Sequence, residues 1–385
     1  MEKRIVVPRI VVRPILPPPL EIGARIRPQW LHWQVGRYRE KLSFGPGGEG
    51  KARIWVPEKE GEQHNLILTQ FYDLLISQYG FIGSSQYAAV GTGSTAPDPT
   101  QTQLVNEIGT SANPRRTNSV PTGESNEIEA LATPGEYDIR RVLEFTEAQV
   151  GGLNLTEWGF SPVSSRNGPL MTRELFRDGL DNPIVLTLDT DQRLRLIYRY
   201  KVTVSPTSAQ DVSVNIGGDG PGIRTAKFLL TGMFSTLDSG RGTVNYFGIN
   251  LSSADSTYRQ RRGDLVVADA LARGGSIGGV GRVGFSSNAA PLTYIHGTEV
   301  FQTNDPNKGL SYDPPSGRSR RASVLLGTTE HVITIKSVIL NGNLFTTTYT
   351  RTSPTVNLVF DNGQEFAKDN LHKLLIAYWQ VTWGP

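Results

Sequence analysis

The sequence predicts a mainly β protein: a β-sandwich, similar to a jelly roll, with one short helix, an extended proline-rich N-terminal arm and a Gly/Ser-rich insertion. Three observations predict this fold. Glycine and proline are frequent, with 41 and 24 residues among 385, which favours strands joined by turns. Residues 192–205 alternate apolar and polar side chains, as a sheet with one wet face requires. Only residues 65–79 show a clear helical apolar stripe, so we expect helices to be few.

Composition shifts along the chain divide it into four segments. We expect residues 1–44 to form an extended basic arm used for assembly or anchoring, and residues 45–205 to form the first part of the sandwich. Residues 206–330 are rich in Gly, Ser and Asp and form an insertion or a small second β domain. Residues 331–385 are expected to complete the sandwich with hairpins.

The N-terminal arm is predicted from its prolines. Residues 1–28 place short β-prone triplets between prolines, and proline fixes φ and removes a backbone donor. We therefore expect an extended segment that cannot be a central strand, and whose apolar side chains need another surface. The candidate interaction residues are Arg4, Arg9, Arg13, Ile15, Leu16, Trp30 and Trp33.

The arm is also basic. Residues 1–41 contain nine Lys or Arg against three acids, a net charge of +6, which leaves −3 for the rest of a chain whose overall charge is +3. A basic tail can bind an acidic protein surface or nucleic acid, or be a solvated terminus. The aromatic side chains between Trp30 and Tyr38 could stack on bases. The many apolar side chains favour docking to a protein, with Trp30 and Trp33 packed against the fold or a neighbouring subunit.

Residues 65–79 are the best helix candidate. Asn65 suits the N-cap and Gly80 the position after the helix C-terminus. The apolar side chains that recur at helical spacing are Leu68, Phe71, Tyr72, Leu75 and Tyr79. We expect this amphipathic helix to lead into a buried strand at residues 87–90.

Further strands are predicted where β-prone runs lie between turns. They are residues 52–56, 137–145, 153–158, 192–205 and 227–230. In the fourth of these, the side chains expected in the core are Leu194, Leu196, Tyr198, Tyr200, Val202 and Val204, and those expected on the wet face are Arg193, Arg195, Arg199, Lys201 and Thr203. Ile197 is the exception to the alternation.

Two hairpins are predicted near the C-terminus. Residues 331–340 and 343–350 flank Asn-Gly, which suits a type I′ turn. Residues 355–360 and a closing strand at 373–383 flank a turn at Asp-Asn-Gly.

No motif predicts catalysis, a metal or a cofactor. Residues 45–51 have the spacing of a phosphate loop, but Ala52 replaces the Ser or Thr and a strand-like run replaces the helix. Residues 279–284 match a dinucleotide fingerprint without a βαβ unit. The chain has no cysteine and its five histidines have no ligand spacing, while Asp189 and Asp191 suit a turn better than a calcium loop. We expect a protein that is not an enzyme, although spacing alone does not locate the paired carboxylates of a glycosidase.

Four segments occur in a recognisable order. Residues 65–75 read NLILTQFYDLL, and residues 90–108 begin VGTGSTAP and end in NEI. Residues 155–200 contain TEWGFS, GPLMTRELFRD and NPIVLTLDTDQRLRLIYRY, and residues 378–384 read YWQVTWG. In this order the segments resemble those of structural proteins from tailed bacteriophages.

The resemblance covers residues 62–205 and 331–385. It implies a virion component made in the host cytoplasm and associated with the tail, as a fibre, tip or baseplate-adjacent protein. Its expected partners are copies of itself, in a symmetric oligomer, and neighbouring virion proteins, without nucleic acid, membrane or cofactor. One alternative is a head or neck fibre or decoration protein. Another is a receptor- or glycan-binding module that reads its target through loops of residues 206–330.

Overall fold

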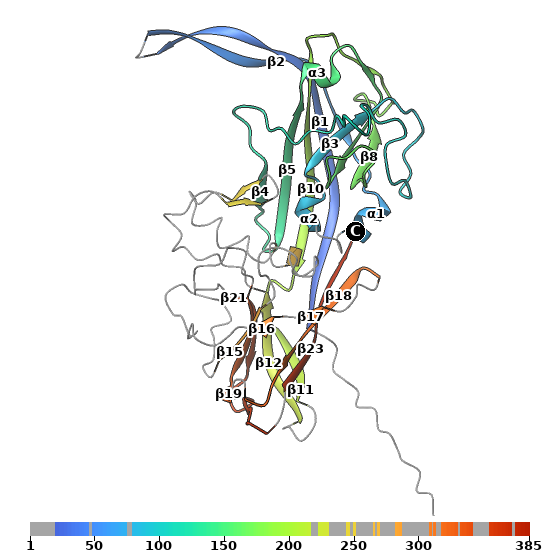
Figure 1. The fold of residues 1–385 in the computed structure, drawn as a ribbon. Coiled ribbons are helices and arrows are strands. Elements are labelled where there is room, and N and C mark those ends of the chain that lie inside the picture. Colours follow the sequence, from blue (N-terminus) through green and yellow to red (C-terminus); the bar gives the residue numbers. More distant parts are fainter. Residues whose placement is uncertain are drawn as a thin grey trace, which may run out of the picture.

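The chain folds mainly into β-strands, as predicted. The computed structural model describes residues 20–45, 48–74, 79–216, 222–230, 244–246, 249–251, 265, 268–269, 282–286, 308–309, 311–312, 317–329, 332–341, 354–371 and 374–385. Figure 1 shows long strands in the upper part of the molecule and a second group of strands below them.

The largest sheet has eight strands and is built around one long strand, β1 (Leu20–Gly45). On one edge, β1 pairs antiparallel with β10 from Gly23 to Gly36. On the other edge it first runs parallel to β23 and then pairs antiparallel with β2. The other members of this sheet are β2 (Gly48–His64), β4 (Glu127–Ala130), β5 (Glu136–Phe145), β10 (Arg193–Ser205), β17 (Ser311–Tyr312), β18 (Ser319–Leu326) and β23 (Leu374–Gly384).

The extended arm predicted for residues 1–44 is therefore wrong from Leu20 onward. These residues form the spine of the largest sheet, with Pro28 inside it. The ladder with β10 is irregular between Pro28 and Leu31, so the missing proline donor falls where the ladder is already interrupted. Two of its partner strands, β10 and β23, lie more than 150 residues away in the sequence, which local patterns do not reveal. Arg4, Arg9, Arg13, Ile15 and Leu16 lie outside the described residues.

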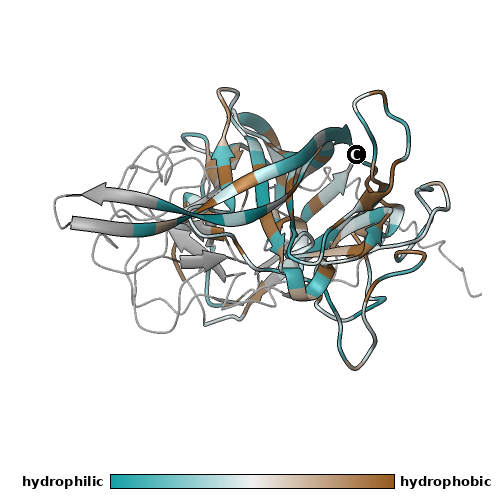
Figure 2. Cartoon of the chain, turned by 90° about the horizontal axis from the view of Figure 1, so that it is seen from above, coloured by the Kyte–Doolittle hydropathy of each residue, from teal (hydrophilic) through white to brown (hydrophobic). Residues whose placement is uncertain are grey.

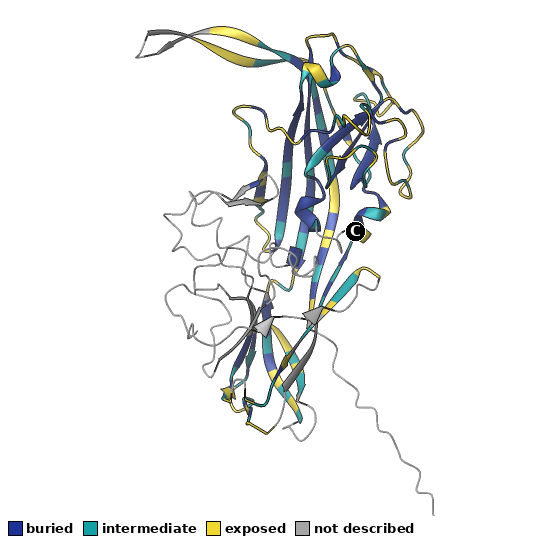
Figure 3. Ribbon diagram, viewed as in Figure 1, coloured by how far each residue is buried: buried dark blue, intermediate teal, exposed yellow. Residues whose placement is uncertain are grey.

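A three-stranded sheet covers the apolar face of the large sheet and completes a sandwich (Figures 1 and 3). Its strands are β3 (Tyr87–Gly91), β7 (Glu157–Ser161) and β8 (Thr172–Leu175). From β7, the Trp158 and Phe160 rings lie 6.2 and 4.4 Å from the ring of Tyr198 on β10. The core half of the alternation predicted for β10 is confirmed, because its six expected core side chains from Leu194 to Val204 are buried. On the opposite face the prediction is wrong for Arg195, which is also buried, against the ring of Trp55.

The helix predicted at residues 65–79 is shorter than expected. Helix α1 (Thr69–Leu74) begins four residues late, because Leu68 N donates to Met171 O and Ile67 forms a bridge with Thr172. Tertiary hydrogen bonds thus override the local helical pattern. The predicted apolar stripe is still buried at Leu68, Phe71 and Tyr72. Among the described residues, α2 (Gly80–Gly83) and α3 (Glu147–Val150) are further short helices.

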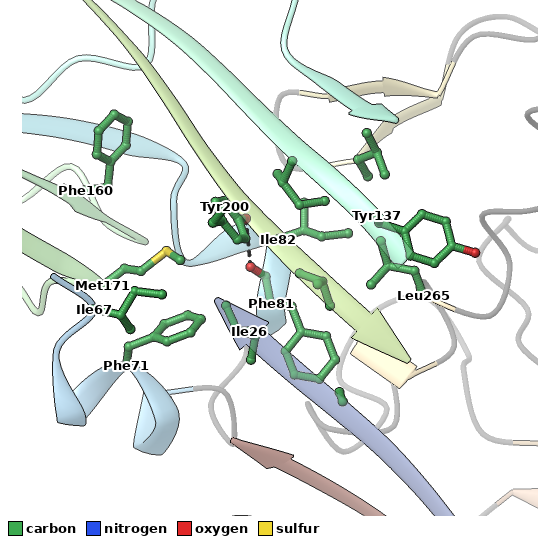
Figure 4. Close-up of a cluster of buried hydrophobic side chains, with 14 of the residues drawn as sticks. Ile26, Ile67, Phe71, Phe81, Ile82, Tyr137, Phe160, Met171, Tyr200 and Leu265 are labelled. Atoms are coloured by element: carbon green, nitrogen blue, oxygen red, sulfur yellow. Dashed lines mark hydrogen bonds between the residues drawn. The ribbon is translucent and has the colours of Figure 1, made fainter. Parts of the chain in front are cut away.

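Helix α2 lies inside the core. Figure 4 shows Phe81 and Ile82 among side chains from β1, β5, β10 and α1. The Tyr200 hydroxyl donates to Phe81 O at 3.0 Å. The buried Arg141 donates to Ser85 Oγ at 2.9 Å and to Ile82 O at 2.6 Å. These bonds satisfy the polar groups of a short helix that is removed from water.

The second large sheet has six strands and lies in the lower part of Figure 1. In order they are β11 (Gln210–Ile216), β12 (Gly222–Leu230), β21 (Pro354–Phe360), β20 (Ser337–Asn341), β15 (Arg282–Ser286) and β16 (Lys308–Gly309). Three two-stranded sheets pair β6 (Asn154–Leu155) with β9 (Leu186–Thr187), β13 (Val244–Tyr246) with β14 (Ile249–Leu251), and β19 (Thr334–Ile335) with β22 (Phe366–Ala367).

Residues 206–330 contribute strands to both large sheets. The hairpin predicted from residues 355–360 and 373–383 is wrong: β21 pairs with β12 and β20, whereas β23 pairs with β18 and β1. The Asp-Asn-Gly turn is present, with Gly363 at φ 77°, but β22 then takes the chain to another sheet. Of the other predicted hairpin, residues 343–350 lie outside the described residues.

Candidate functional site

The hairpin formed by β1 and β2 extends from the top of the body (Figure 1). Its strands stay paired from Trp30–His64 to the tip at Gly45–Gly48. The neighbouring strand β10 ends its pairing with β1 at Gly36. Beyond Gly36 the hairpin is therefore a two-stranded ribbon, exposed over residues 39–41 and 51–54. Figure 2 shows hydrophilic residues along it as it leaves the body.

Aromatic rings attach one face of this hairpin to the body. The Tyr38 and Trp55 rings contact each other edge to face at 5.5 Å. The Arg195 guanidinium lies 4.2 Å from the centre of the Trp55 ring, and its Nη2 donates to the Tyr38 hydroxyl at 3.2 Å. The Tyr38 hydroxyl in turn donates to Glu144 Oε2 at 3.3 Å, and burial raises the pKa of Tyr38. The stacking of an arginine on aromatic rings of the hairpin attaches the root of the ribbon to β10 and so stabilises its orientation on the body.

Ion pairs attach the opposite face. Arg37 Nε contacts Glu58 Oε1 at 2.9 Å, and Arg37 Nη1 contacts Asp191 Oδ2 at 2.5 Å. Asp189 is also within reach, at 3.3 Å from Arg37 Nη2. The predicted turn at residues 189–191 is thus an anchor for the hairpin root. Hydrogen bonds from Gln192, and then from Arg37 and Arg39, lower the pKa of Glu58 to about 2.

Glu58 is expected to make the hairpin root sensitive to acid. Its pKa is lower in the folded chain than in the unfolded one, so its contribution to stability is present above a pH of about 4.5 and is lost as the pH falls towards 2. Acid unfolding followed by tryptophan fluorescence should therefore show a weaker pH dependence in this window for Glu58→Gln than for the wild type. Identical acid dependence in the two proteins would contradict this assignment.

The face of the large sheet that points away from the three-stranded sheet carries cross-strand ion pairs. Arg195 Nη2 contacts Glu144 Oε2 at 2.9 Å, and Lys201 Nζ contacts Glu136 Oε2 at 2.6 Å. Arg199 pairs with Asp138, and burial raises the pKa of Asp138 against the opposing effect of Arg199. This face is therefore polar but internally neutralised.

The two tryptophans predicted as interaction residues lie on opposite faces of β1. Trp33 is buried, with its ring 6.3 Å from that of Phe176. Gly61 faces it across the hairpin, and a Cβ there would lie 2.5 Å from the Trp33 ring. Trp30 is partly exposed beside Arg199, at 5.3 Å. The structure thus does not bring the two tryptophans together, and Trp33 packs against its own chain.

The motif residues from 90 to 108 and 155 to 175 meet in a buried ion pair that sequence reasoning missed. Glu157 and Arg173 on β7 and β8 are fully buried and pair at 2.9 Å. Glu157 also accepts hydrogen bonds from the backbone N–H groups of Gly93, Val105 and Asn106, at 3.0, 3.0 and 2.7 Å. The carboxylate therefore ties the loop after β3 to the three-stranded sheet.

The glycines of this motif make room for that carboxylate. A Cβ on Gly91 or Gly93 would lie 2.5 or 2.6 Å from Glu157 Oε1. Farther along the loop, the buried Glu107 and Arg116 form a second pair, with Nε–Oε1 and Nη2–Oε2 distances of 2.8 Å. The segments that carry the family resemblance are thus used to build the fold.

The described residues contain no cluster of three or more His, Asp or Glu that could hold a metal. His32 instead contacts Glu60 at 3.2 Å on the hairpin. Of the glycine-rich segment at residues 45–51, Gly45 ends β1 and residues 48–51 begin β2, so a strand and not a helix follows the glycines. A phosphate loop needs a helix N-terminus there, so this geometry does not suit nucleotide binding.

Comparisons with protein-family models, curated proteins and solved structures found no match to this chain. None of the described helices has the length and apolar character that a membrane crossing requires.

Proposed function

We propose that this chain is a structural subunit of a tailed bacteriophage particle. It is associated with the tail and assembles with copies of itself and with neighbouring virion proteins. The observation that carries the proposal is the hairpin of β1 and β2, which leaves the body as a two-stranded ribbon held at its root by aromatic and ionic contacts. An isolated two-stranded ribbon is only marginally stable in water, so a ribbon fixed in this way suits contact with another subunit.

The motif residues support the same proposal. The resemblance to phage structural proteins depends on segments whose polar residues form buried ties, as Glu157 and Arg173 do. These residues hold a scaffold and face no solvent-accessible reaction centre. A rigid scaffold with projecting, charged surface elements suits a protein whose work is to assemble, where many weak contacts add up through effective concentration.

The proposal is tested on particles. Virions from the phage that encodes the chain would be purified by density gradient, and the chain quantified by mass spectrometry. Gold-labelled antibody against the chain would then locate it by electron microscopy. We expect an integral number of copies per particle, with label on the tail. Absence of the chain from purified particles would overturn the proposal, and label on the head alone would restrict it to the head-fibre alternative.

A further inference from the structure

We propose that two copies of this chain pair through the outer edges of their β2 strands, antiparallel about a two-fold axis at Val56. This inference names the partner and the surface for the assembly role proposed above, and it rests on that role. The pairing would join the two eight-stranded sheets edge to edge. Each hairpin tip would then lie beside the hairpin root of the other copy.

The first argument is that the outer edge of β2 is open. Within the described residues, β2 forms a ladder with β1 alone. Its other edge presents backbone N–H and C=O groups along 17 residues. An open edge of this length is a template for another strand. Beyond Gly36 no strand among the residues placed by the structure adds to the ribbon, so a partner could supply the third strand.

The second argument is the distribution of charge along β2. Cross-strand partners in an antiparallel pair project from the same face. Arg53 pairs with Glu40, Glu60 with Gln34, and Glu62 with His32. The β1 partners all have even numbers, so the three β2 residues share one face.

A β-bulge keeps them on that face. Gly36 pairs with Pro57 and Val35 with Lys59, so Glu58 is an extra residue in β2. In a regular strand without a bulge, Glu60 and Glu62 would lie on the face opposite to that of Lys51 and Arg53, because the two pairs lie an odd number of positions apart. The bulge thus gives this face a basic half near the tip and an acidic half near the root.

The two halves are complementary when the strand meets a copy of itself. In an antiparallel pair centred on Val56, with the bulge of each strand opposite Trp55 of the other, Arg53 faces the partner's Glu60 and Lys51 faces the partner's Glu62. The same contacts repeat on the other side of the axis, as a two-fold interface requires. A parallel arrangement would place like charges together, which is unfavourable.

The four charged side chains are accessible for this contact. Arg53 and Glu62 are exposed, and the side chains of Lys51 and Glu60 are 68% and 55% exposed. Within the chain, Lys51 pairs with Glu40, an equally exposed side chain, and exposed pairs of this kind contribute little. Pro57 has no backbone N–H, so the ladder would lack one hydrogen bond beside the axis and would consist of two hydrogen-bonded segments, one on each side of it. The charged side chains would then determine which residues pair.

A charge swap on the full-length chain tests the inference. The variants are Lys51→Glu/Arg53→Glu, whose β2 face is acidic throughout, and Glu60→Lys/Glu62→Lys, whose β2 face is basic throughout. Sedimentation velocity over a range of concentrations would measure the association step. We expect each variant alone to associate at least about tenfold more weakly than the wild type, because like charges meet across the interface. An equimolar mixture should recover the wild-type association, since each chain then meets the opposite charge.

Two further variants serve as matched controls. Arg25→Glu/Arg27→Glu and Glu127→Lys/Glu129→Lys change the same number of exposed charges on β1 and β4. These controls should associate as the wild type does, and circular dichroism should show that all four variants fold. Wild-type association that is absent, unchanged in both β2 variants, or not recovered in the mixture would overturn the inference. The particle experiment above is independent of this result, so either proposal can fail alone.

Discussion

Replacing Glu157 by alanine is expected to destabilise the fold by about 3–5 kcal/mol, because it leaves Arg173 as an uncompensated buried charge. Both side chains are fully buried. The substitution also removes the acceptor for the backbone N–H groups of Gly93, Val105 and Asn106, and unsatisfied buried donors are costly. Urea unfolding at neutral pH, followed by tryptophan fluorescence, would measure the loss as a fall in the transition midpoint.

Glu40 provides the matched control. It also pairs with a cation, Lys51 at 2.9 Å, but the two side chains are 61% and 68% exposed. Glu40→Ala should change stability by no more than about 1 kcal/mol. An equal loss of stability in both variants, or no loss in Glu157→Ala, would show that the buried pair does not hold the loop after β3 to the three-stranded sheet.

The alternation of apolar and polar residues predicted the core side chains of a strand that packs one face against the second layer of the sandwich. The six expected core side chains of β10 are buried, because a period of two needs no knowledge of the partner strand, whereas the burial of Arg195 on the other face depends on the hairpin of β1 and β2. The same reasoning failed for β1. Its partners β10 and β23 are distant in sequence, and Pro28 argues against a central strand unless the irregularity beside it is known.

The surface features were less accessible to sequence reasoning. The short strand at residues 52–56 was predicted, but not the long hairpin to which it belongs. The signal was present in residues 51–54, which alternate charged with apolar or small residues, and in the glycine-rich run before them. The ion pair between Glu157 and Arg173 left no comparable signal, because nothing in a single sequence shows which charges are buried together.

The course of β1 leads to the second prediction, that residues 20–28 are needed for the fold. Removing residues 1–28 takes away Leu20 to Arg25, the parallel partner of β23, and the start of the ladder with β10. It also removes the buried side chains of Ile22 and Ile26, each worth about 1.5–3 kcal/mol in burial. Thermal unfolding and soluble yield should show that the 29–385 chain melts far lower than the 20–385 chain, or aggregates.

The two deletions separate folding from assembly. Arg4, Arg9, Arg13, Ile15 and Leu16 are removed by both, so a defect that both proteins share belongs to residues 1–19, whereas a defect of the 29–385 chain alone belongs to the sheet. If the 20–385 chain folds but is not incorporated into particles, its missing residues act on a partner. If it is incorporated normally, assembly depends on surfaces of the folded body, such as the hairpin of β1 and β2. Equal melting of the two truncated chains would contradict the central position of β1, because the large sheet would then hold without the strand that joins β10 to β23.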